Sequence, residues 1–199
     1  EISEISEVCR SNNLPLHMDG ARLANAIVSM GVQIADCTWR AGVDILSLGA
    51  TKNGVFAAEA VVFFDVSKAA DFEFRRKRGG HLFSKLRFLS SQLVPYLESN
   101  YWLKLADNSN SRARELAQGL NKIKSISILA DVQTNMIFLQ MPTHFVDILK
   151  KENCLFYSWG EKEGSISARF VTSFNTSKHE VAQVLSIIKH ADSITKPKL

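Results

Sequence analysis

The sequence has little cysteine, proline or glycine, and each shortage excludes a class of protein. The three cysteines, Cys9, Cys37 and Cys154, lie far apart and in no C-x-x-C pair. Neither a disulfide framework nor a zinc site is therefore expected, and a reducing cytoplasm fits best. Ten glycines and four prolines are too few for a collagen-like or low-complexity chain. No apolar run approaches the roughly 20 residues that a membrane-spanning helix needs, so we expect no membrane partner.

What the chain does contain is the composition of a globular protein. Of its 199 residues, 46% are apolar and 22% are charged, which is enough apolar content to bury a core. The net charge of +4 permits an anionic ligand. A basic chain indicates nucleic-acid binding only where its charge is clustered, so the balance by itself predicts no nucleic-acid partner.

Helices and strands alternate in the first part of the chain. The sequence opens at Glu1 without a methionine, inside a helix predicted by the spacing of Ile2, Ile5 and Val8, so we expect a piece of a longer protein. The elements expected next are a strand over 14–18, a helix over 21–30, and strands over 43–48 and 60–64. This order is typical of an α/β architecture with helices on both faces of a sheet.

The pattern then turns helical and later becomes mixed again. Leucines recur at helical spacing between 67 and about 121. Further on, strands are predicted over 135–141 and 166–172, and the Ser177–Glu180 capping box opens a last helix. We expect the end of one α/β domain, a helical connector, and a small α/β domain from about residue 122.

An acid and a base follow the first predicted strand. Asp19 stands at its end and Arg22 comes three residues later. In open α/β sheets, ligands bind beyond the carboxyl ends of the strands. Asp19 can pair there with a cationic nitrogen and Arg22 with an anionic oxygen. The alternative is a local ion pair between the two that caps the next helix.

A lone lysine, Lys52, follows the next predicted strand within a run of small residues. A lysine in a partly apolar site can act as an amine nucleophile and form a Schiff base with a carbonyl. The alternative is a solvent-facing loop lysine. An acid after one strand and a lysine after the next is how pyridoxal-phosphate enzymes hold their cofactor: the acid keeps the pyridine nitrogen protonated and the lysine holds the aldehyde.

Two segments together, LHMDGARLANA at 16–26 and DILSLGATKNG at 44–54, closely resemble the low-specificity L-threonine aldolases. These are fold-type-I pyridoxal-phosphate enzymes of the β-eliminating-lyase superfamily. The resemblance continues through RRKRGGH at 75–81, QTNM at 133–136 and ARFVT at 168–172, and so covers essentially the whole chain.

The resemblance implies a role for each matched residue. Lys52 would be the Schiff-base lysine, Asp19 would pair with the pyridinium nitrogen, and Arg22 would contact the phenolic oxygen of the ring. Arg169 would hold the substrate carboxylate with its planar pair of donors; the alternative is a charge at the end of a strand. The implied cofactor is pyridoxal 5′-phosphate.

The resemblance also implies the architecture and the reaction. Residues 1–80 would be the C-terminal portion of the large cofactor-binding domain, 81–121 connecting helices, and 122–199 the small α/β domain. The full-length protein would be a cytoplasmic homo-oligomer, a dimer of dimers, in amino-acid metabolism. It would cleave L-threonine or L-allo-threonine to glycine and an aldehyde.

The chain departs from the family in two respects. Relatives are considerably longer, and the part expected before Glu1 should include the loop around the cofactor phosphate and the histidine that stacks on its ring. Ser173 stands where many relatives carry a histidine, which leaves the role of that position open.

Six basic residues and no acid occupy the stretch 75–87, together with Phe83. One interpretation is a nucleic-acid patch with phosphate contacts and aromatic stacking. A second, from the family, is that Lys77 reaches the cofactor phosphate of a neighbouring subunit. A third is a solvated helix face.

Three rival functions stay open at this point. Another fold-type-I lyase, one that performs β-elimination, would share Asp19, Lys52 and Arg169 but break a different bond. A non-catalytic basic α/β binding module would not need Lys52. Finally, this length of chain could be an inactive fragment, because half a site does not hold a cofactor tightly.

Overall fold

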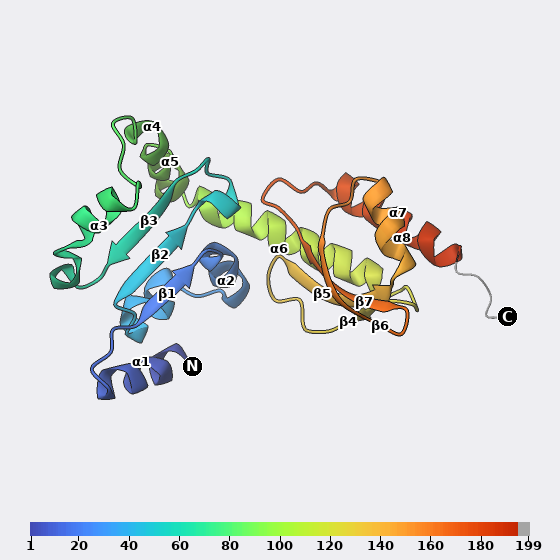
Figure 1. The fold of residues 1–199 in the computed structure, drawn as a ribbon, viewed down its shortest axis with the longest axis horizontal. Coiled ribbons are helices and arrows are strands. Elements are labelled where there is room, and N and C mark those ends of the chain that lie inside the picture. Colours follow the sequence, from blue (N-terminus) through green and yellow to red (C-terminus); the bar gives the residue numbers. More distant parts are fainter. Residues whose placement is uncertain (195–199) are drawn as a thin grey trace. The chain divides into compact units, whose positions relative to one another are not determined.

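The computed structural model describes residues 1–194 and divides the chain into two compact units, Glu1–Ala106 and Asp107–Leu199 (Figure 1). The boundary falls inside the long helix α6, Tyr101–Leu120, which contributes to both units. The three-part division expected from the sequence stays a prediction for the full-length protein.

A three-stranded sheet forms the centre of the first unit, with the order β1-β2-β3. Strands β1 and β2 are parallel, whereas β3 runs antiparallel to β2. The strands are β1 His17–Gly20, β2 Ile45–Gly49 and β3 Glu59–Phe63. The predicted strands are thus present, with bounds shifted by a few residues.

Helices and turns connect and flank these strands. Gly31 ends α2 in the left-handed conformation, with φ +65°, which glycine adopts without a Cβ penalty. The elements are α1 Ile2–Ser11, α2 Leu23–Met30, the 3-10 turns η1 Ile34–Cys37, η2 Trp39–Ala41, η3 Thr51–Asn53 and η4 Val66–Ala69, and the helices α3 Phe72–Arg78, α4 Arg87–Ser90 and α5 Leu93–Glu98.

The two faces of this sheet differ. Leu46 and Leu48 point into a core formed with residues of α2, α5 and α6, such as Leu23, Ile27 and Trp102. The opposite face of the sheet carries His17 and Asp19 of β1 and Val61 of β3, which are exposed. Because side chains alternate along a strand, one face supplies the stability and the other is available for chemistry.

An antiparallel four-stranded sheet with the order β4-β5-β7-β6 organises the second unit. Its elements are β4 Ser127–Ile128, β5 Met136–Pro142, α7 His144–Lys151, β6 Tyr157–Lys162, β7 Ser165–Val171 and α8 Lys178–Ser193. Ile137 and Ala168 are fully buried in a core with Phe145 of α7, Leu120 of α6 and Ile188 of α8.

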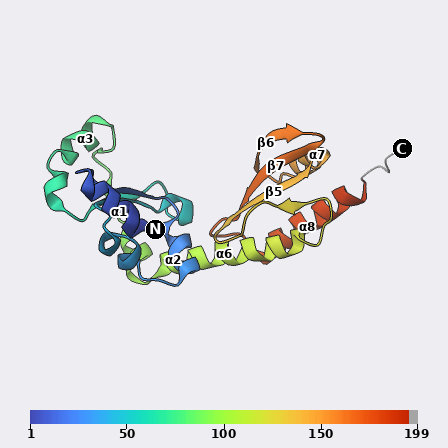
Figure 2. The same cartoon turned by 90° about the horizontal axis from the view of Figure 1, so that it is seen from below.

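The helices α6 and α8 run side by side in this unit (Figure 2). A Cβ added at Gly119 of α6 would lie 2.4 Å from a methyl carbon of Leu185 of α8, so the Leu185 side chain packs directly against the backbone of α6 there. The predicted capping box at the start of α8 is confirmed: the Ser177 hydroxyl accepts from the Glu180 amide at 3.2 Å, and the Glu180 carboxylate accepts from the Ser177 amide at 2.7 Å. These bonds lower the pKa of Glu180.

None of the helices in residues 1–194 combines the length and the apolar character needed to span a membrane.

Candidate active site

The carboxyl ends of β1 and β2 meet at one edge of the first unit's sheet. The strands are parallel, and Asp19 pairs in register with Ser47. Just beyond them, a Cβ added at Gly49 would lie 2.5 Å from the Cα of Ala21. The segment that follows Asp19 and the segment that leads to Lys52 are therefore in backbone contact, which brings these two predicted site residues to the same edge.

Asp19 has one carboxylate oxygen engaged by its own turn. Its Oδ1 accepts a hydrogen bond from the Ala21 amide at 2.9 Å. Within residues 1–194, Oδ2 accepts no hydrogen bond, and the side chain is exposed. The local bond orients the carboxylate and leaves one oxygen for a ligand.

A histidine and a serine stand beside Asp19 on the same face. His17 precedes Asp19 by two residues, and its Nε2 lies 2.8 Å from the Oγ of Ser47. The pair is not predicted from the sequence as a unit, because it joins residues of two different strands. The strand alternation that places positions 17 and 19 on one face was the available signal.

Lys52 lies in the 3-10 turn η3, and its side chain is exposed. In the described part of the chain, its amine has neither a hydrogen bond nor an ion pair. The residues around it are held firmly. The Glu59 carboxylate accepts hydrogen bonds from the amides of Ala50 and Thr51, at 3.0 and 3.2 Å.

A buried amide side chain holds the other end of this turn. The Nδ2 of Asn53 donates to the hydroxyl of Tyr96 and to the carbonyl of Trp102, both at 2.8 Å. Burial raises the pKa of the Tyr96 hydroxyl above its ordinary value. Lys52 is thus a free amine on an anchored turn.

Arg22 occupies the N-cap position of α2 and is half-buried. The backbone of Arg22 therefore lies at the same sheet edge as Asp19, three residues further along the chain.

Arg169 belongs to the second unit, where it sits on β7 between Phe138 of β5 and Tyr157 of β6. Its guanidinium carbon lies 5.5 Å from the centre of the Tyr157 ring. Its Nε is buried, and no hydrogen bond reaches that atom within residues 1–194. A guanidinium with a spare donor beside an aromatic ring is suited to binding an anion.

Residues 1–142 match the sequence pattern of the family described as beta-eliminating lyase. The chain belongs to the β-eliminating lyase family.

The two curated relatives compared next are both named as low-specificity L-threonine aldolases. The chain is 38% identical over 189 residues to the low specificity L-threonine aldolase of Pseudomonas aeruginosa, covering 95% of this chain and 54% of that protein. It is 30% identical over 142 residues to a probable low-specificity L-threonine aldolase 2 of Arabidopsis thaliana. This match covers 71% of this chain and 39% of that protein. The chain spans about half the length of the curated relatives it matches.

Solved structures agree on the fold. A threonine aldolase of Leishmania major superposes with a TM-score of 0.86 at 25% identity, over 96% of this chain and 56% of that one. A serine palmitoyltransferase of Sphingomonas wittichii superposes with a TM-score of 0.66 at 13% identity, over 97% of this chain and 51% of that one. At this identity the likeness concerns the fold alone. The predicted fold class, the C-terminal part of a fold-type-I pyridoxal-phosphate enzyme with a small α/β domain, is confirmed.

Membership of the β-eliminating lyase family implies pyridoxal 5′-phosphate as the cofactor. The sheet edge fits that group on its own chemistry. Asp19 offers an uncommitted carboxylate oxygen, the group that pairs with a protonated ring nitrogen, and Lys52 offers an unpaired amine for an aldehyde. Gly49 allows the two segments that carry these groups to approach each other, since a Cβ there would lie 2.5 Å from the Cα of Ala21.

Lys77 lies on α3, away from the residues named above in sequence, and is exposed. It belongs to a run of four cations in the last turn of that helix, where the helix dipole favours positive charge. This placement is compatible both with a solvated face and with a contact to an external phosphate.

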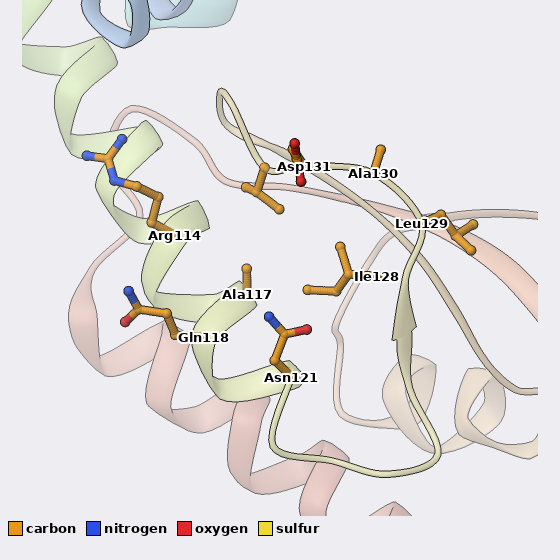
Figure 3. Close-up of a pocket in the computed structure, with 9 residues that line it drawn as sticks. Arg114, Ala117, Gln118, Asn121, Ile128, Leu129, Ala130 and Asp131 are labelled. Carbon is orange, nitrogen blue, oxygen red and sulfur yellow. The ribbon is translucent and has the colours of Figure 1, made fainter.

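A cavity of about 480 Å³ in the second unit does not contain these residues (Figure 3). It lies between α6 and the segment that follows β4. Ala117 and Asn121 of α6 lie on one side of it and Ile128 of β4 on the other. None of the five predicted site residues lines it.

Proposed function

We propose that the full-length protein is a pyridoxal-phosphate-dependent aldolase that cleaves L-threonine, L-allo-threonine and related β-hydroxy-α-amino acids to glycine and an aldehyde. The observation that supports this most is the convergence of Asp19 and Lys52 at one sheet edge of a β-eliminating lyase chain. The names of its relatives in Pseudomonas and Arabidopsis supply the substrate class.

The cofactor, when bound, supplies an aldehyde that condenses with an amine and a ring that accepts the electron pair of a broken bond. Lys52 would hold that aldehyde through its amine. Asp19, through Oδ2, would keep the proton on the ring nitrogen, and Arg22 would contact the phenolic oxygen. The Asp19 carboxylate is ready for this because the Ala21 amide already fixes its other oxygen.

Arg169 binds the substrate carboxylate. Its support is the buried Nε, which has no hydrogen-bond partner within residues 1–194. A guanidinium with such a donor on a sheet face favours an anionic ligand, since a planar pair of N–H donors matches the two oxygens of a carboxylate.

The full-length protein works as a dimer of dimers in the cytoplasm, where it serves amino-acid metabolism. Lys77 reaches the cofactor phosphate of a neighbouring subunit. The support is its exposure on α3, the helix that also carries the exposed Phe74, since an exposed large apolar side chain favours a protein contact. Three free cysteines are in keeping with a reducing compartment.

Cofactor trapping tests the proposal. The full-length protein is incubated with pyridoxal phosphate, reduced with borohydride, and the added mass is located by peptide mapping, with Lys52→Ala as the matched variant. A label on Lys52 that disappears in the variant is expected. Scattered labelling of surface lysines would contradict the assignment. The same test on the 199-residue chain shows whether this length alone captures the cofactor.

Product analysis separates the aldolase from another lyase of the same fold. With L-threonine, glycine and acetaldehyde in equal amounts are expected. Release of ammonia with a keto acid would instead indicate β-elimination, with Lys52 and Asp19 retained in their roles.

A further inference from the structure

A single carboxylate, that of Glu59, holds the backbone just before Lys52. Glu59 is the first residue of β3 and pairs in register with Gly49, the last residue of β2. Its two oxygens divide between two consecutive amides: Oε2 accepts from Ala50 at 3.0 Å and Oε1 from Thr51 at 3.2 Å. The carboxylate therefore spans the two amides that lie immediately before Lys52.

The rest of the turn is held by contacts that do not involve Glu59. The carbonyl of Ala50 accepts from the amides of Asn53 and Val55, at 3.0 and 3.2 Å. The Asn53 side chain is tied to α5 and α6. In the N-terminal half of the turn, the Thr51 hydroxyl donates to the Ala58 carbonyl at 3.4 Å, a longer bond than the two that Glu59 accepts. Glu59 is consequently the main side chain that holds this half of the turn.

The Glu59 carboxylate is suited to holding two amides, and its exposure allows the residue to be substituted. Hydrogen bonds from amides to an ionised acceptor are stronger than those to a neutral one, and two of them fix an orientation as well as a distance. Glu59 is exposed, while Ala50 is fully buried. Substitution at 59 thus leaves the core beneath the turn intact.

We propose that Glu59 is a positioning residue for Lys52, which fixes the direction in which the amine leaves the sheet edge. The proposal rests on the proposed function of Lys52. A nucleophile on a fixed turn meets its carbon in a narrow range of directions, whereas a loosened turn spreads the amine over many. A purely structural cap would affect unfolding only.

The experiment uses the full-length protein and three variants, Glu59→Ala, Glu59→Gln and the matched control Glu73→Ala. Glu73 is an exposed acid of the same unit, on α3, so its removal changes the charge but not the turn. Three quantities are measured: amide hydrogen exchange at residues 50 and 51, the rate at which borohydride fixes pyridoxal phosphate on Lys52, and the thermal midpoint.

Glu59→Ala is expected to speed exchange at both amides and to slow the labelling of Lys52 by roughly tenfold or more at a temperature where it is folded. Glu59→Gln keeps one acceptor oxygen and is expected to restore part of the rate. Glu73→Ala should match the wild type in all three measurements.

Unchanged labelling of Lys52 in Glu59→Ala, or a loss no greater than the unfolded fraction explains, would overturn the proposal while leaving the role of Lys52 intact. If Glu59→Ala does not fold, Glu59→Gln is compared with the wild type instead. Faster exchange at the amide of residue 50 or 51 with an unchanged rate of Lys52 labelling would then overturn the proposal. Absence of Lys52 labelling in the wild type would instead refute the proposed function, and this inference with it.

Discussion

Gly49 and Ala21 bring two segments into backbone contact at the edge of the first sheet. A Cβ at position 49 would lie 2.5 Å from the Cα of Ala21, closer than real Cβ atoms approach, and it would also crowd the carbonyl of Ala21. One segment continues from Asp19 and the other continues to Lys52. The spacing of the two predicted chemical groups therefore depends on the absence of a side chain at Gly49.

Gly49→Ala should destabilise the protein by about 2 kcal/mol or more, because the clash is with backbone and cannot be relieved by a rotamer change. Gly31→Ala is the comparison: its Cβ would meet nothing within 4 Å, although φ is +65°. That change should cost only about 1 kcal/mol, from backbone strain alone. Denaturant unfolding of both variants measures the difference, and equal costs would contradict the close approach.

Asn53→Ala should lower the free energy of unfolding by about 2–3 kcal/mol, because it leaves the buried Trp102 carbonyl and Tyr96 hydroxyl without the donor they share. Tyr96→Phe removes only one of these partners and should cost about 1 kcal/mol. Chemical denaturation of the two variants tests the ranking; a larger loss for Tyr96→Phe would speak against the Asn53 anchor.

The pH dependence of stability should include a contribution from Asp44 at the start of β2. The Lys68 ammonium donates to one of its oxygens and the Leu16 amide donates to the other at 2.8 Å, and together they lower the pKa of Asp44 below its usual value of about 3.9. A depressed pKa means that the unfolded state binds the proton more tightly. The stabilisation is thus complete above about pH 4 to 5 and is lost as the pH falls through the pKa of the folded state.

Asp44→Asn should therefore be less stable than the wild type at pH 7, by about 1 kcal/mol. The gap should close as the pH falls through the depressed pKa of Asp44 in the folded state, because below it both side chains are neutral. Thermal unfolding over a pH series gives the two curves, and a gap independent of pH would show that Asp44 acts through packing rather than charge.

Arg169→Ala should reduce kcat/KM for L-threonine in the full-length enzyme by roughly 10- to 100-fold, since it removes charged hydrogen bonds to the substrate carboxylate. Tyr157→Leu should raise KM by roughly two- to fivefold, because the ring lies 5.5 Å from the guanidinium carbon and its cation–π contact is lost. Tyr157→Phe keeps the ring and should behave like the wild type. Steady-state kinetics of the three variants would refute the assignment if Arg169→Ala left KM and kcat unchanged.

Local patterns predicted much of the chain. Apolar runs at 43–48 and 60–64 became β2 and β3, the helical stretch before residue 121 became α3 to α6, and Ser177 with Glu180 forms the expected cap. Two strands escaped prediction for physical reasons. The two-residue β4 is too short to show a period, and most of β6 is exposed, so its sequence lacks the apolar alternation of a buried strand.

The sequence by itself determined which chemical groups follow the strands, because Asp19 and Lys52 stand next to apolar runs that a sheet must bury. It also determined the family, since those groups occur in a specific local order. Only the tertiary structure decided what holds them. Glu59 reaches the Lys52 turn because β3 runs antiparallel to β2, Asn53 meets Tyr96 from 43 positions away, and His17 meets Ser47 across two strands. These contacts join residues that are distant in sequence, so their geometry depends on strand direction and register, which no local pattern contains.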